Sequence, residues 1–237
     1  MNNRKVLAVL LIAPHQDDES IGCGGLLAKL KSTGHTTHVQ HIYGGYTNVM
    51  AENKGDAAHI RLSEAQECSR ILGFNLLDNF GFQDRGYAGI GLIIDSLIEL
   101  FHRIQPDVVL CPHSNENDYE HQAVYQACKE SLWLSKIARF KNYGTHNRKP
   151  SVLLCYEVWT PIQHPTLYID ISEYIDLKEK AINAHSSQVS GTNWAKGAQG
   201  LNAYRGTTLK GAGYFEAFET QQLTSEQVSI LSTLLTL

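Results

Sequence analysis

The chain has few of the features that mark disulfide-rich, secreted or membrane proteins. Its five cysteines are widely spaced and include no Cys-x-x-Cys pair, so we expect buried thiols in a reducing compartment rather than a disulfide scaffold. The apolar run at residues 6–13 is much shorter than the ~20 residues that cross a bilayer. Acidic residues follow this run directly, where a signal peptide would need small residues. The sequence therefore predicts a cytoplasmic protein without a membrane span.

An excess of charge of one sign is also lacking. The 20 basic and 24 acidic residues leave a formal net charge of −4 with histidine neutral, so no basic face for nucleic acid is indicated. Of the 237 residues, 43% are hydrophobic and 19% are charged, which excludes a wholly disordered chain. Since domains usually hold about 100–200 residues, we expect one domain over residues 1–237 with a full-sized core.

Apolar runs typical of strands buried on both faces alternate along the chain with helix-like segments. The expected strands cover residues 6–12, 38–43, 76–80, 108–111, 152–156 and 167–171. The expected helices cover residues 26–33, 56–72, 91–104, 122–134 and 177–185, and long loops at 44–55 and 191–213 are expected to shape a ligand pocket. This alternation predicts an α/β fold with a mostly parallel sheet flanked by helices. In such sheets, ligands bind beyond the carboxyl ends of the strands.

The loop after the first expected strand concentrates polar groups that suit metal chemistry. It reads His15-Gln16-Asp17-Asp18-Glu19, and three adjacent acids repel one another unless a cation compensates them. The imidazole of His15 and the carboxylate of Asp18 are ligands that suit zinc, which leaves Asp17 free to act as a general base on a water that the metal activates. The alternative is a solvated acidic turn in which Asp17 or Asp18 caps the next helix.

Three glycines follow this loop, where a dinucleotide-binding fingerprint would place them. They are Gly22, Gly24 and Gly25, and they come after a strand and open a helix. The acidic loop in front of them would repel a pyrophosphate. We therefore expect these glycines to allow close packing of the helix on the sheet rather than to bind phosphate.

A second polar loop follows the expected strand at residues 108–111. It would lie at the same sheet edge as the first loop if the two strands are neighbours. Because catalytic zinc usually has three protein ligands, we predict that His121, at the start of a helix, is the third ligand. Asp118 and Glu120 would then orient imidazoles, and His113 either takes part in the site or only closes the strand. The alternative is a polar loop with incidental histidines.

At these residues the sequence resembles the PIG-L/LmbE-like family of zinc-dependent N-deacetylases, which act mainly on N-acetylglucosamine-type sugars. The hallmark of that family, a strand followed by His-Pro-Asp-Asp-Glu, is similar to residues 15–19, with Gln16 in place of proline. The resemblance implies a single Rossmann-like domain with Zn²⁺, or another divalent metal such as Fe²⁺, held by His15 and Asp18. It also implies that Asp17 is the general base.

The family's His-x-Asp-His signature reads Asp-Tyr-Glu-His at residues 118–121. Its last histidine implies that His121 is the third metal ligand. Its leading histidine, which is proposed in the family to protonate the leaving amine or to stabilise the oxyanion, is replaced by Asp118. Three candidates for this catalytic role stay open. They are Asp118, Asp17 acting as both base and acid, and His185, our best substitute elsewhere in the chain. A His185 that only interacts with a helix dipole is the alternative.

Further matches extend the resemblance over residues 6–218. Arg61 stands in an Arg-x-x-Glu segment that ends at Glu64, and the resemblance implies that this arginine binds substrate. His113 is our second candidate for a substrate-binding residue. The resemblance implies hydrolysis of the acetyl amide of an N-acetylated amino sugar or glycoconjugate, so the expected partner is a small molecule.

Two other kinds of function stay open. An amidase with the same site would act on a different acyl amide, and the altered second signature keeps this alternative open. A protein that only binds a metal, a sugar or a nucleotide on the same scaffold would not need catalytic groups, and a nucleotide binder would not need zinc. The sequence identifies neither the sugar nor its aglycone, and it leaves open whether the chain forms a homo-oligomer.

Overall fold

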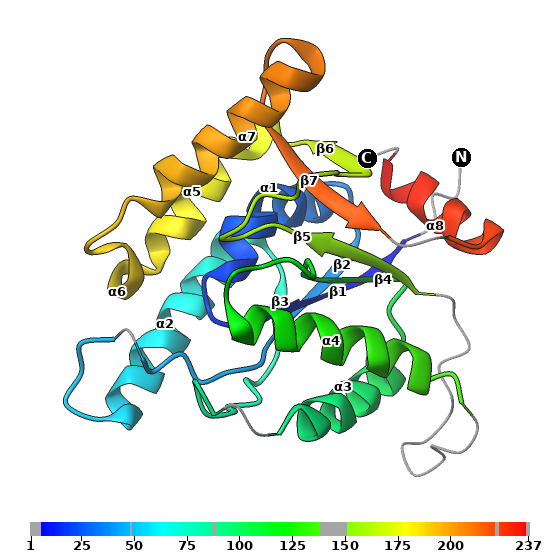
Figure 1. Ribbon diagram of the computed structural model, residues 1–237. Helices are drawn as coiled ribbons and strands as arrows, with labels where there is room; N and C mark the ends of the chain where they lie inside the picture. The colour runs from blue at the N-terminus through cyan, green and yellow to red at the C-terminus, as the bar shows by residue number, and fades with distance from the viewer. Residues whose placement is uncertain (1–5, 48, 87–88, 138–150, 221–222, 236–237) are drawn as a thin grey trace.

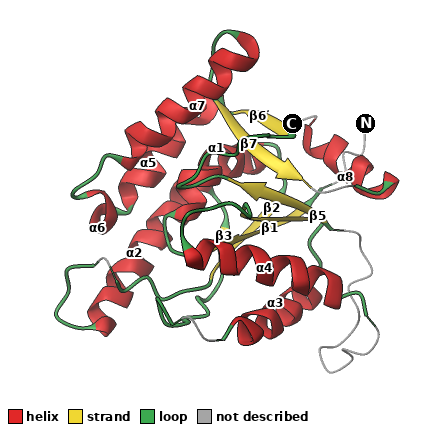
Figure 2. Ribbon diagram, in the orientation of Figure 1, coloured by secondary structure: helices red, strands yellow, loops and turns green. Residues whose placement is uncertain are grey.

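The computed structural model describes residues 6–47, 49–86, 89–137, 151–220 and 223–235. Within these residues the chain forms one seven-stranded sheet with helices on both faces (Figures 1 and 2). The predicted α/β architecture, with a mostly parallel sheet flanked by helices, is therefore confirmed.

The sheet has the order β3-β2-β1-β4-β5-β7-β6, and its first five strands are parallel. The last two are antiparallel to their neighbours. The parallel strands in sheet order are β3 (Asn75–Leu76), β2 (Thr36–His41), β1 (Ala8–Ala13), β4 (Val108–Pro112) and β5 (Val152–Tyr156). They are followed by β7 (Phe215–Thr220) and β6 (Leu167–Asp170). Every residue of β4 and β5 is buried, which explains their uninterrupted apolar sequences.

Two layers of helices cover the sheet. One face carries α1 (Asp18–Ser32), α2 (Lys54–Leu72), α5 (Ile175–Ala184) and α7 (Trp194–Lys210), and the other carries α3 (Ile90–Ile104) and α4 (Tyr119–Leu134) (Figure 1). The shorter elements are a 3₁₀ turn (Ser172–Tyr174), α6 (Ser186–Val189) and α8 (Ser225–Leu235). Because side chains alternate along a strand, β1 contributes Leu11 to the core under α1 and Ile12 to the core under α3 and α4.

The first and second polar loops meet because β1 and β4 are neighbours. β1 pairs with β2 on one side and with β4 on the other, so the strand order reverses between β1 and β4. The carboxyl ends of both strands lie at this switch point, where α/β sheets bind ligands. A shared site required the two strands in front of the polar loops to be neighbours, and β1 and β4 are neighbours.

The prediction of a loop at residues 191–213 is wrong, because most of this segment forms α7 (Trp194–Lys210). Glycine-rich segments usually form loops, yet Gly206 lies inside the helix for a packing reason. A Cβ at Gly206 would collide with the carbonyl oxygen of Gly213. The glycine thus allows close approach of the helix and the chain that follows it.

Several element boundaries also differ from those expected. Helix α1 begins at Asp18, eight residues earlier than the expected residue 26, since the glycine segment is itself helical. Helix α2 begins at Lys54 rather than at the expected residue 56, and it is capped by Asn53, whose side-chain oxygen accepts the N–H groups of Gly55 and Asp56. Strand β7 and helix α8 were not expected as elements.

The predicted packing role of the α1 glycines is confirmed. A Cβ at Gly22 would meet the ring of Tyr156, and a Cβ at Gly25 would meet the side chain of Ile171. A Cβ at Gly24 would meet the aliphatic stem of Lys178. Small residues on this face therefore let α1 approach β5 and α5 closely.

All five cysteines are free and buried, as expected. In the part of the chain that the structure describes, no helix combines the length and apolar character needed to cross a membrane.

Candidate metal and catalytic site

Three side chains from two distant loops converge at the β1/β4 edge. His15 follows β1, Asp18 begins α1 and His121 lies in the first turn of α4. The Oδ2 atom of Asp18 is 3.5 Å from His15 Nδ1 and 3.3 Å from His121 Nε2. One ligand atom from each residue lies within 4.8 Å of those of the other two. The structure thus brings together the three residues that the sequence proposed as metal ligands.

The chemistry of this cluster fits a divalent metal ion. Its donor set of two imidazoles and one carboxylate is typical of zinc sites with an open position. Asp18 Oδ1 and His121 Nδ1 are buried and accept or donate no hydrogen bond within the described residues. Buried polar atoms are normally paired, so these two atoms indicate that the cluster is adapted to a group beyond the protein.

Without a bound metal ion, protons on His15 and His121 would compensate the negative charge of Asp18. Burial lowers the pKa of His15, but hydrogen bonds to Asp18 and Glu120 outweigh this effect and raise the pKa to about 10. Burial likewise opposes ionisation of Asp18, but the positive charge of His121 and His15 holds the pKa of Asp18 well below its usual range. The pKa of His121 is raised against the effect of burial, mainly by Asp18. A cation would replace these protons.

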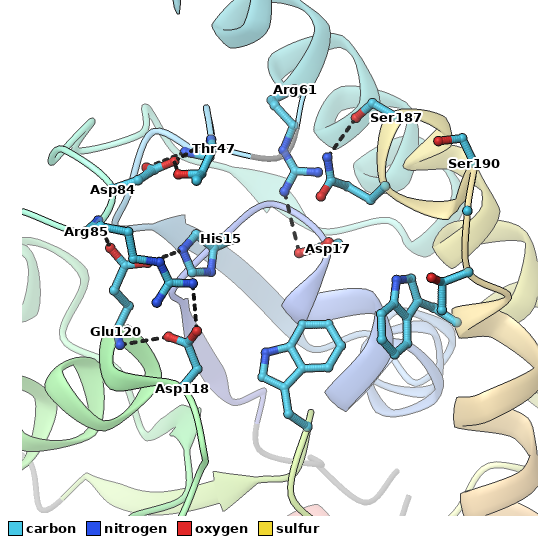
Figure 3. A pocket seen from close by; sticks show the side chains of 16 residues that line it. His15, Asp17, Thr47, Arg61, Asp84, Arg85, Asp118, Glu120, Ser187 and Ser190 are labelled. Carbon is cyan, nitrogen blue, oxygen red and sulfur yellow. Dashed lines mark hydrogen bonds and ion pairs between the residues drawn. The ribbon is translucent and has the colours of Figure 1, made fainter. Parts of the chain in front are cut away.

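Asp17 occupies a strained position beside the three residues. Its φ of 148° and ψ of −30° are rarely adopted by a residue with a side chain. The backbone N–H of Asp17 donates to Glu19 Oε2 at 3.0 Å, and its Oδ1 lies 3.5 Å from Arg61 Nη2 (Figure 3). Burial raises the pKa of Asp17, and Arg61 partly offsets this rise. A raised pKa makes a carboxylate a stronger base than an ordinary aspartate, which suits proton transfer in both directions.

A buried group of two histidines supports Glu19 behind Asp17. His41 Nε2 lies 3.1 Å from Glu19 Oε2, and His185 Nε2 lies 3.4 Å from Glu19 Oε1. Both histidines are buried, and neither lines the cavity described below. His185, a candidate for the missing catalytic histidine, therefore lies next to the support of Asp17. The sequence analysis did not single out Glu19 or His41, although Glu19 closes the first motif.

Asp118 lies at the rim of the site and is fully engaged as an acceptor. Its Oδ1 accepts the backbone N–H of Glu120 at 2.8 Å, which caps α4, and its Oδ2 accepts Arg85 Nη2 at 2.8 Å (Figure 3). Burial raises the pKa of Asp118, but the hydrogen bond from Arg85 and the charge of His121 outweigh it and lower the pKa. Asp118 is therefore an ionised acceptor rather than a proton donor.

The two candidates for substrate contact lie in different environments. Arg61 lines the cavity, and its Nη2 donates to the carbonyl oxygen of Gln16. His113 is buried outside the cavity lining, and its Nε2–H donates to the carbonyl oxygen of Thr160 at 2.7 Å. Arg61 is therefore part of the cavity wall, whereas His113 links its own loop to the segment at Thr160.

A polar cavity of about 450 Å³ opens above these groups (Figure 3). Its walls carry hydrogen-bonding side chains, two arginines and two tryptophan rings. The residues that line it besides His15, Asp17 and Arg61 include Thr47, Asp84, Arg85, Trp159, Ser187, Gln188 and Trp194. Trp159 was not singled out from the sequence, because no local pattern distinguishes a cavity tryptophan from a core one.

The fold and the site together define a class of protein: a Rossmann-like α/β domain with a His–Asp–His cluster and an adjacent Asp at the strand switch point. A family model described as "PIG-L: GlcNAc-PI de-N-acetylase" matches residues 10–132, just over half of the chain. The chain therefore belongs to the PIG-L family of deacetylases, as its sequence motifs suggested.

Similarity to individual members of the family is distant. The chain is 24% identical to diacetylchitobiose deacetylase of Thermococcus kodakarensis, with 80% of this chain and 73% of that protein covered. It is 28% identical to the uncharacterized deacetylase YaiS of Escherichia coli, with 78% and 93% covered. It is 23% identical to a probable N-acetyl-alpha-D-glucosaminyl L-malate deacetylase of Bacillus cereus, with 76% and 83% covered.

Solved structures show the same fold. The N,N'-diacetylchitobiose deacetylase of Pyrococcus horikoshii is 26% identical, with a TM-score of 0.82 over 93% of this chain and 86% of that one. A 4-carboxy-2-hydroxymuconate hydratase of Pseudomonas putida, at 18% identity, reaches a TM-score of 0.80 over 93% and 99%. Because a hydratase shares the fold, the fold by itself does not determine the reaction.

Proposed function

We propose that the protein is a metal-dependent N-deacetylase that removes the acetyl group from an N-acetylated amino sugar or its conjugate. The observation that carries this proposal is the convergence of His15, Asp18 and His121 beside Asp17, with His15 and Asp17 lining one polar cavity. Membership of a deacetylase family supports the reaction class. The relatives named for diacetylchitobiose and for N-acetylglucosaminyl malate support the substrate class.

In this proposal His15, Asp18 and His121 hold Zn²⁺, or another divalent ion such as Fe²⁺. When bound, such an ion lowers the pKa of a water molecule and polarises the amide carbonyl. Asp17 accepts the proton of the attacking water. The new carbon–oxygen bond forms first at the amide carbonyl carbon. Asp17 then returns the proton to the leaving nitrogen, and the C–N bond breaks to give acetate and the free amine. The raised pKa of Asp17 suits both transfers.

The other candidate residues take supporting parts. Asp118 is an ionised acceptor, so we propose that it acts by holding Arg85 at the rim rather than by giving a proton. His185 acts through Glu19, which holds the backbone of Asp17. Arg61 faces the cavity and would position a hydroxyl or an anionic group of the substrate. His113 is not placed to contact a ligand in the cavity, so its contribution is to fix the loop at Thr160.

The test is Asp17→Asn measured against the unchanged protein. We expect acetate release to fall by about 10²–10⁴-fold because a general base is lost, while bound zinc, measured by elemental analysis, stays at one ion per chain. The substrates are a panel of N-acetylglucosamine, diacetylchitobiose, N-acetylglucosaminyl malate and N-acetylated nucleotide sugars. Glu67→Gln, on the exposed side of α2, is the matched control and should retain activity.

Three outcomes would contradict the proposal. Full acetate release by protein stripped with a chelator would exclude the metal. Release from other acyl amides but not from any sugar would favour the amidase alternative. Zinc binding without any hydrolysis would favour a binding protein.

A further inference from the structure

One wall of the cavity is a short stretch of chain at residues 186–194, which runs from α6 to the first residue of α7 and is called the α6 wall below. The residues of this wall that line the cavity are Ser187, Gln188, Ser190, Gly191, Thr192 and Trp194. Figure 3 shows Ser187 and Ser190 on the same side of the cavity as Arg61. Because the serine, threonine and glutamine side chains carry hydroxyl and amide groups, the α6 wall is suited to hydrogen-bond the hydroxyl groups of a sugar.

The near end of the α6 wall is held by one carboxylate, that of Glu64 on α2. Its Oε1 accepts the hydroxyl of Ser186 at 3.0 Å and the backbone N–H of Ser187 at 2.6 Å, and its Oε2 accepts the hydroxyl of Ser187 at 2.8 Å. The far end is held by packing, since the ring of Trp194 lies 4.7 Å from that of Trp159. In the part of the chain that the structure describes, the other hydrogen bonds of the wall join near neighbours along the chain. Glu64 is therefore the point at which hydrogen bonds fix this wall to the rest of the fold.

Glu64 itself is buried between the α6 wall and Arg61. It is 7% exposed and is not part of the cavity lining, whereas Arg61 is. Arg61 Nη1 lies 3.9 Å from Glu64 Oε2. A buried carboxylate needs both an opposite charge and hydrogen-bond donors; Arg61 supplies the charge, and the wall supplies the donors. The Arg-x-x-Glu segment that the sequence analysis singled out thus has two parts, because its arginine faces the cavity and its glutamate faces the wall.

We propose that Glu64 is a positioning residue for the substrate, and this inference rests on the proposed function. Glu64 holds the α6 wall in the conformation that binds the sugar, so the wall is ordered before the substrate arrives. A wall that must be ordered during binding lowers affinity. The chemical step depends instead on the metal cluster and Asp17. Loss of the bonds to Glu64 should therefore raise KM and leave kcat nearly unchanged.

The first experiment measures acetate release from the best sugar of the panel. Glu64→Ala removes all three bonds and should raise KM by about 10-fold, because the wall is then ordered only on binding. Ser186→Ala removes one bond without changing the cavity lining or Arg61, and it should raise KM by about 2–3-fold. Glu64→Gln keeps a carbonyl oxygen that accepts from Ser186 and Ser187, so its KM should return to within about twofold of that of the unchanged protein. Glu67→Gln, on the exposed side of the same helix, is the matched control and should change neither constant.

The second experiment measures amide hydrogen exchange by mass spectrometry and does not depend on activity. In Glu64→Ala the amides of residues 186–192 should exchange faster than in the unchanged protein, because the N–H of Ser187 loses its acceptor and the wall loses its anchor. The exchange of α1 should stay the same, which shows that the fold is intact. Glu64→Gln and Glu67→Gln should exchange like the unchanged protein in both segments.

The two proposals fail in different ways. If Glu64→Ala leaves KM and the exchange of residues 186–192 unchanged, Glu64 does not position the wall and the proposed function stands. If kcat falls as KM rises, or if Glu64→Gln behaves like Glu64→Ala, Glu64 acts through its charge on Arg61 and the positioning role is overturned. If the unchanged protein releases no acetate from any sugar, the proposed function fails, and the exchange measurement still decides whether Glu64 holds the wall.

Discussion

Two buried clusters of charge contact the same helix, α1, and they are built on opposite principles. Lys178 Nζ donates to Glu216 at 2.7 Å, and the same carboxylate accepts the backbone N–H groups of Gly25 and Leu26 at 2.8 Å each. Both carboxylate oxygens of Glu216 have partners. At the start of the helix, by contrast, Asp18 Oδ1 has no hydrogen-bond partner among the residues that the structure describes. The complete set of bonds around Glu216 fits a cluster that holds the fold, whereas the unpaired oxygen of Asp18, beside two imidazoles, fits a cluster that binds a metal ion.

The largest effect on stability should come from breaking the complete cluster. Lys178→Met keeps most of the side-chain volume but leaves Glu216 as a buried carboxylate without its ammonium partner. We expect the free energy of unfolding to fall by about 3–5 kcal/mol, measured by chemical denaturation without metal. Arg70→Met is the control, because the Arg70–Glu67 pair is exposed and surface pairs contribute little.

A Lys178→Met protein with an unchanged denaturation midpoint would mean that the pair is not a structural element, and the contrast between the two clusters would fail. The double variant Lys178→Met with Glu216→Gln sharpens the test. It removes the unpaired charge and should recover part of the lost stability.

The second prediction concerns the cluster of His15, Asp18 and His121. We expect a metal ion bound there to stabilise the folded protein. A ligand that binds only the folded state stabilises it by about 2.7 kcal/mol when present at 100 times its Kd. We expect zinc to give this increment to the unchanged protein in denaturation experiments. Asp18→Asn, which removes the charged ligand, should lose the increment, whereas Lys178→Met should keep it on a lower baseline. Equal increments in all three proteins would indicate that zinc binds elsewhere.

The features that could be predicted from the sequence are those that follow from strand patterns alone. The strands at residues 108–111 and 152–156 were found because a parallel sheet covered on both faces leaves uninterrupted apolar runs. The proximity of His15 and His121 followed from a general rule, that ligands gather where strand order reverses. Neither inference required knowledge of side-chain contacts.

The features that could not be predicted from the sequence depend on contacts between distant segments of the chain. Trp159 is separated from His121 by 38 positions, and nothing local marks its indole as a neighbour of that ring. His185 could be identified as polar, but only the fold places it against Glu19. The glycine-rich helix α7 was read as a loop because the contact of Gly206 with Gly213 is formed only in the folded chain.

Asp84 shares a feature with each of the two clusters. It lines the cavity, as His15 does, but both of its carboxylate oxygens accept hydrogen bonds, as those of Glu216 do. Its carboxylate accepts the N–H of Gly45 at 2.8 Å, the N–H of Thr47 at 3.0 Å and the hydroxyl of Thr47 at 2.8 Å. Burial raises its pKa, but these hydrogen bonds outweigh the rise and lower the pKa. We therefore expect Asp84 to stabilise the loop at residues 45–47 in its ionised form.

The third and smallest prediction follows from the direction of that shift. Because the pKa of Asp84 is lower in the folded than in the unfolded protein, its contribution is complete above the ordinary aspartate pKa of about 3.9 and is lost as the pH falls toward the folded value. At neutral pH, Asp84→Asn should cost about 1 kcal/mol of unfolding free energy, since the group is only half buried. The cost should shrink in acid, where Asp84 of the unchanged protein is itself protonated.

Thr47→Val, which removes one of the three bonds, should give a smaller loss of the same sign. Denaturation at pH 7 and pH 3 checks this, and a cost for Asp84→Asn that grows in acid would show that the carboxyl is bound in its protonated form.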